Sequence, residues 1–114
     1  MEVVKNKKGK ISLQKLTPLD WEFMREAVIM FIKELDVNYV EDILICCILS
    51  ELFLQKNNSV LLSSLPQKIA LKNYQIIALQ RVLLAQDESP YYKAIGQELF
   101  SHFYHKVINN RLIQ

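Results

Sequence analysis

The sequence predicts a mainly α-helical fold, with about four helices packed as a small bundle. The 114 residues include only two Gly and three Pro, whereas all-β folds need many turns rich in such residues. Hydrophobic residues make up 51% and charged residues 23%, which is ordinary for a globular domain. A chain of this length can bury one core without disulfides or metal, so we expect a single domain.

The beginning of the chain is polar and basic. We expect residues 1–9 to form a flexible basic arm, followed by a single helical domain over residues 10–114. Residues 10–16 then alternate between apolar and polar side chains, with Ile11 and Leu13 apolar. This alternation is typical of a short, half-buried strand.

The first helix has a clear start signal. Thr17 is an N-cap candidate, Pro18 suits the first helical position, and Asp20 stands where a capping-box acid is expected. The helix should extend to about Leu35. Residues 27–32 are apolar without a gap, so more than one face of this helix must be covered.

The second helix is predicted from Tyr39 to Gln55, after a break at Asp36 and Asn38. It is apolar on nearly every face, which indicates the central helix. A buried strand over residues 43–49 is the alternative, but length and the helix-like flanks favour a helix.

Two segments of the chain begin alike. Lys-Ile-Ser-Leu starts at Lys10 and Lys-Ile-Ala-Leu starts at Lys68, 58 residues later. Each leads into a capped helix. The ordinary preferences of apolar residues for strands and of polar residues for helix N-caps explain this similarity as well as an internal duplication does. The two segments can pair, so the prediction includes a short two-stranded β ribbon of residues 10–16 and 67–72.

The second half contains a turn and two further helices. Lys56 to Ser59 reads as a turn. Asn73 caps a third helix to about Ala85, and Ser89 with Pro90 starts a fourth that extends to about Asn110.

Charge is distributed in blocks along the chain. Residues 16–51 carry two basic and eight acidic side chains, whereas both flanking segments are basic. Four lysines of the arm are candidates for phosphate contacts: Lys5, Lys7, Lys8 and Lys10. They support an alternative function as a nucleic-acid-associated regulator or an accessory protein of a phage or mobile element. The small net charge of +2 weighs against it.

The sequence contains no pattern typical of catalysis or of metal binding. Cys46 and Cys47 are adjacent, so both thiolates cannot comfortably reach one zinc ion together with His102 and His105. Phosphate-binding loops and nucleophile elbows are absent from the sequence. We therefore expect a non-enzymatic protein without a cofactor or a small-molecule substrate.

The sequence feature that points to a function is the apolar surface of the first two helices, which is more than one small layer can cover. We expect a protein partner or a homo-oligomer, bound through exposed apolar side chains. The interface candidates are Trp21, Phe23, Ile29, Met30, Ile45, Leu49 and Leu54. Two alternatives stay open: the fold buries all of them, or they line a groove for an amphipathic helix of another protein.

The expected location is cytoplasmic. The first ten residues lack the apolar segment of a secretory signal. The most apolar run, residues 43–49, is far shorter than the about 20 residues needed to cross a bilayer, so no membrane partner is expected.

Overall fold

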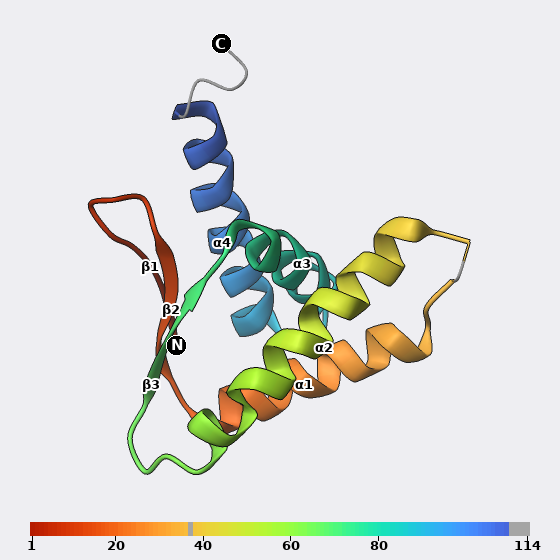
Figure 1. The fold of residues 1–114 in the computed structure, drawn as a ribbon, viewed down its shortest axis with the longest axis horizontal. Coiled ribbons are helices and arrows are strands. Elements are labelled where there is room, and N and C mark those ends of the chain that lie inside the picture. The colour runs from red at the N-terminus through yellow and green to blue at the C-terminus, as the bar shows by residue number, and fades with distance from the viewer. Residues whose placement is uncertain (37, 110–114) are drawn as a thin grey trace.

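The computed structural model describes residues 1–36 and 38–109 of the chain. It has four α-helices and one three-stranded antiparallel sheet, so the mainly helical class with a small sheet is confirmed (Figure 1). The elements in chain order are β1 Glu2–Lys5, β2 Ile11–Leu16, α1 Pro18–Lys33, α2 Val40–Leu61, β3 Gln67–Leu71, α3 Asn73–Leu84 and α4 Pro90–Asn109.

The sheet has the order β1-β2-β3, with β2 in the centre. The expected pairing of the two similar segments is confirmed, because Ile11 lies opposite Leu71 and Leu13 lies opposite Ile69. Alternation along the strands turns one apolar face toward the helices. Its buried members are Val3, Ile11, Leu13, Ile69 and Leu71.

The structure places residues 2–9 in β1 and the turn that follows it, whereas the sequence suggested a flexible basic arm over residues 1–9. Residues 2–5 are β1, which pairs with β2, and Val3 is buried opposite Leu13. The terminal amino group donates to the Tyr91 hydroxyl at 2.7 Å. Backbone pairing and the burial of Val3 therefore hold the N-terminus against the fold, which the high lysine content concealed.

Helix α1 begins as predicted, with Thr17 as N-cap. The Asp20 backbone N–H donates to Thr17 Oγ1 at 3.2 Å, and the Thr17 N–H donates to Asp20 Oδ2 at 3.2 Å, which completes a capping box. Trp21 and Met24, four and seven residues beyond the cap, are fully buried in the core. Helix α1 therefore enters the core within its first two turns.

Helix α2 is longer than the sequence suggested. Residues 56–59, expected as a turn, lie inside α2. Trp21 Nε1 donates to Asn57 Oδ1 at 3.0 Å, and Val60 is completely buried. These tertiary contacts outweigh the local turn preference of Asn and Ser.

Helices α3 and α4 form the other half of the molecule and pack closely against each other (Figure 1). The N-cap of α3 is Lys72 rather than Asn73, and its N–H donates to Gln75 Oε1 at 2.9 Å. Helix α4 begins at Pro90, as predicted. Its expected end near Asn110 lies outside the described residues. In Figure 1, α2 crosses the view between α1 and α3, and it packs against both.

Candidate protein-interaction surface

Helix α2 exposes an apolar ridge to solvent. Packing against α1 on one side and α3 on the other leaves its outward residues uncovered. Helical spacing of three and four residues places them on one face. We define this α2 ridge as Val40, Ile43, Leu44 and Cys47. Leu44 retains 54% of its surface exposed, so the ridge is an apolar surface of the kind that marks interfaces.

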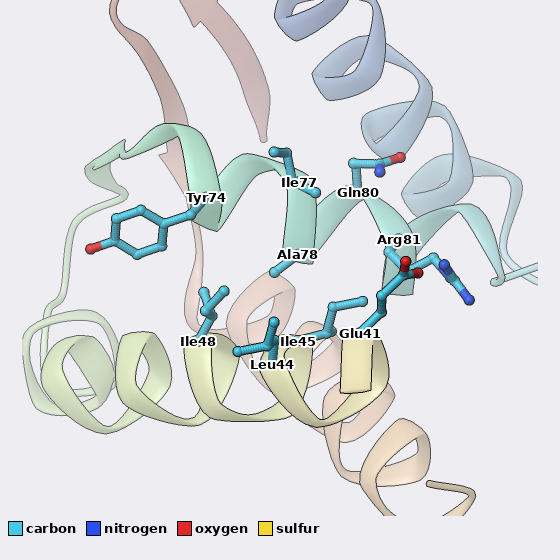
Figure 2. Close-up of a pocket in the computed structure, with 9 residues that line it drawn as sticks. All are labelled: Glu41, Leu44, Ile45, Ile48, Tyr74, Ile77, Ala78, Gln80 and Arg81. Carbon is cyan, nitrogen blue, oxygen red and sulfur yellow. The ribbon is translucent and has the colours of Figure 1, made fainter. Parts of the chain in front are cut away.

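A groove of about 290 Å³ runs between α2 and α3 beside this ridge (Figure 2). Its walls are mostly aliphatic. The α2–α3 groove is lined by Glu41, Leu44, Ile45, Ile48, Tyr74, Ile77, Ala78, Gln80 and Arg81. Leu44 belongs to both the ridge and the groove, so the convex and concave apolar surfaces are continuous.

Polar groups mark the ends of the α2–α3 groove. Figure 2 shows Tyr74 at one end and Glu41 with Arg81 at the other. Arg81 Nη2 lies 3.7 Å from Asp42 Oδ1, an ion pair that joins α3 to the first turn of α2. The Gln80 side chain points away from α2, and its buried Oε1 has no hydrogen-bond partner among the described residues. The middle of the groove is therefore apolar.

A second groove, of about 270 Å³, lies between α1 and α2. The α1–α2 groove is lined by Arg25, Val28, Ile29, Ile32, Ser50, Phe53, Leu54 and Asn57. Leu54 is 81% exposed at its edge. Helix α2 thus has an apolar groove on each side, which explains why its sequence is apolar almost all round.

The structure places some of the interface candidates in the core and others at the surface. Trp21 and Leu49 are fully buried, because each packs in the core, and cannot form a surface. Phe23 is half-buried, and its ring stacks on Tyr92 with centroids 3.8 Å apart. Ile45 is also buried, and it forms part of the α2–α3 groove.

The remaining candidates reach the surface to different degrees. Leu54 and the half-buried Ile29 line the α1–α2 groove, and Met30 is exposed on α1. Sequence reasoning missed Tyr74 and Ile77, which line the α2–α3 groove from α3. The sequence could have identified them as surface-lining residues, because both fall beside the buried stripe of α3 rather than on its polar face.

The two cysteines differ in environment. Cys46 is buried and Cys47 is exposed on the α2 ridge. Burial raises the pKa of the Cys46 thiol, and the charges of Cys47 and Asp42 raise it further. Cys46 is therefore a protonated core residue at neutral pH, whereas Cys47 is accessible to reagents. Among the described residues, no cluster of three His, Cys, Asp or Glu side chains is arranged to hold a metal ion.

The nucleic-acid candidates gather at the hairpin between β1 and β2. Lys7, Lys8 and Lys10 are exposed around its turn, and Lys5 is half-buried at the end of β1. In Figure 1 this turn stands apart from the helices. The lysines therefore form a structured tip away from the α2 ridge.

Comparison with known proteins adds no family to this description. No protein-family model, curated protein or solved structure matches the chain. None of the helices within the described residues is both long and apolar enough to cross a membrane.

Proposed function

We propose that the protein is a non-enzymatic assembly subunit that self-associates through the α2 ridge and the α2–α3 groove. The observation that carries this proposal is their adjacency: each copy supplies a convex apolar ridge directly beside a concave apolar groove. In a two-fold dimer the same patch meets itself, so the ridge of one copy fills the groove of its partner and the contact occurs twice. Interdigitation of helix ridges and grooves is the usual way in which helices pack.

The required contact area is compatible with this surface. A stable interface covers about 800 Å² of each partner, roughly a tenth of the 7504 Å² surface of the described chain. The ridge alone is too narrow for that area. The interface therefore extends onto the flanks of α2, where the α1–α2 groove and Leu54 provide further apolar surface.

A second copy fits this surface better than a foreign helix does. If the groove only bound a helix of another protein, the exposed apolar ridge beside it would remain unexplained. Val40, Ile43 and Leu44 are large apolar residues that a monomer leaves in water. Self-association removes both surfaces from water in a single contact.

Analytical ultracentrifugation over a micromolar concentration series tests the proposal. We expect a wild-type dimer, and we expect Leu44→Lys and Ile77→Lys to sediment as monomers, because each places an ammonium in the apolar contact. Leu62→Lys is the matched control, since Leu62 is 82% exposed beyond the C-terminal end of α2. A monomeric wild type at every concentration, or dimers for both groove variants, would contradict the proposal.

Cys47 provides an independent measurement in the wild-type chain. In the monomer the exposed Cys47 thiol reacts with a maleimide, whereas the buried Cys46 does not. Dimerisation through the ridge covers Cys47, so its reaction rate should fall as the protein concentration rises. A rate independent of concentration, in a sample that sediments as a dimer, would place the interface elsewhere.

A further inference from the structure

A second surface, opposite in character to the α2 ridge, lies at the β1–β2 hairpin. Pairing of Ile11 with Leu71 brings the residues that adjoin them, Lys10 and Lys72, side by side at one end of the sheet. Lys7 and Lys8 lie on the turn next to them. We define the basic tip as Lys7, Lys8, Lys10 and Lys72, all of which are exposed.

The charges of the basic tip are not neutralised within the fold. Among the ion pairs formed by residues 1–36 and 38–109, none includes these four lysines. Glu2 lies opposite Gln14, at the end of the β1–β2 ladder far from the turn, and pairs with Lys15 at 3.0 Å. Like charges on neighbouring strands destabilise a sheet, so a cluster without acidic partners indicates a surface that binds an anion.

The start of α3 adds to this positive field. Helices α1 and α2 carry acidic residues in their first turns, which suit the positive end of the helix dipole. Helix α3 has none there, and its N-cap is Lys72. Lys72 Nζ lies 5.8 Å from the centre of the Tyr74 ring, which holds the ammonium near the helix end.

The hairpin presents these lysines in a fixed geometry. Asn6 Oδ1 accepts hydrogen bonds from the N–H groups of Lys8 and Lys10, both at 2.9 Å. Gly9 has a φ of +82°, the left-handed conformation that closes a three-residue hairpin turn. Because the turn is ordered before binding, little conformational entropy is lost when it contacts a ligand.

We infer that the basic tip binds the phosphate backbone of duplex DNA. Strand β3 flanks β2 as far as Ile11, so only residues 6–10 of the hairpin project beyond the three-stranded sheet, and their lysines are placed to contact phosphates. The turn sequence Asn-Lys-Lys-Gly-Lys carries no apolar side chain to enter a bilayer, so a membrane is the poorer match. The acidic excess of residues 16–51 lies on α1 and α2 and orients the tip toward the DNA.

Fluorescence anisotropy with a labelled duplex of arbitrary sequence tests this inference. Four phosphate contacts predict a slope of about −3.6 for log K against log salt, and a loss on the order of 100-fold between about 50 and about 200 mM salt. The double variant Lys7→Gln/Lys8→Gln should lower the slope to about −1.8. Its control, Lys33→Gln/Lys56→Gln, changes the net charge equally on exposed sites of α1 and α2 and should leave the slope unchanged.

Several outcomes would overturn the inference. The first is no binding at low salt by a protein whose melting temperature is that of the wild type. The second is an equal loss of affinity in the control variant, since it would show that net charge alone matters. Tighter binding to a duplex RNA would identify RNA as the ligand, and tighter binding to phosphatidylserine vesicles would identify a membrane as the ligand.

Discussion

Gly96 of α4 lies against the backbone of α3, and its replacement tests how closely these helices pack. A Cβ atom placed on Gly96 would stand 2.9 Å from Leu83 Cβ and 3.0 Å from the Leu84 backbone nitrogen. Neither atom belongs to the flexible end of a side chain. Gly96→Ala therefore forces α3 and α4 apart rather than displacing one rotamer.

Two opposing effects set the size of the change. Alanine in a helix interior is favoured over glycine by about 1 kcal/mol. Overpacking a tight contact costs about 1–3 kcal/mol, and a clash with backbone belongs at the upper end of that range. We expect Gly96→Ala to lower the free energy of unfolding by about 2 kcal/mol, which corresponds to a fall of about 8 °C in Tm.

Urea unfolding followed by circular dichroism measures this difference. Ala94→Gly provides the reference, because Ala94 is exposed on the same helix and reports helix propensity without packing. It should lose about 1 kcal/mol. If Gly96→Ala is instead more stable than the wild type by a similar amount, propensity alone decides the outcome and the close approach of α3 and α4 is wrong.

Two further predictions concern the ends of α1 and α2. The Tyr92 hydroxyl donates to Asp20 Oδ1 at 3.0 Å, and burial, followed by this bond and the Asp20 charge, raises the pKa of Tyr92 to about 12. Because the folded state holds the phenol proton more tightly, the stability from this group is complete below about pH 10 and is lost as pH rises toward 12. Burial also raises the pKa of Tyr91. Ultraviolet titration should therefore show that Tyr92→Phe removes the tyrosine that titrates last, and persistence of that step would refute the assignment. Trp21→Phe keeps an aromatic ring in the core but removes the hydrogen bond to Asn57. Urea unfolding should therefore show a free energy of unfolding lower by about 1–2 kcal/mol. An unchanged midpoint would show that this hydrogen bond adds nothing to stability.

Local chemistry explains why parts of the fold were predictable. The Thr17–Asp20 box starts α1, and Pro90 starts α4, because caps and N-terminal prolines act within one turn of the chain. The similar strands β2 and β3 also follow from a local alternation. Their pairing places Ser12 opposite Ala70, the residue 58 positions later that the sequence comparison aligns with it.

Other parts were decided by contacts between distant residues. Strand β1 exists because Val3 reaches the core beside Leu13, although four of the first ten residues are lysines. Helix α2 continues through residues 56–59 because Trp21 and the buried site of Val60 hold its last turns. Such contacts have no signature in the local sequence.

The candidate surfaces divide in the same way. The sequence by itself determined that α2 has more apolar surface than one layer can cover, and that the chain begins with clustered lysines. Only the tertiary structure decided that Trp21 and Leu49 are core, while Leu44 and Ile77 flank a groove. It also placed Lys72 beside Lys10 by pairing β3 with β2. The physical reason is that periodicity fixes which residues share a face of one element, whereas the packing of elements far apart in the chain fixes which of those faces stay in water.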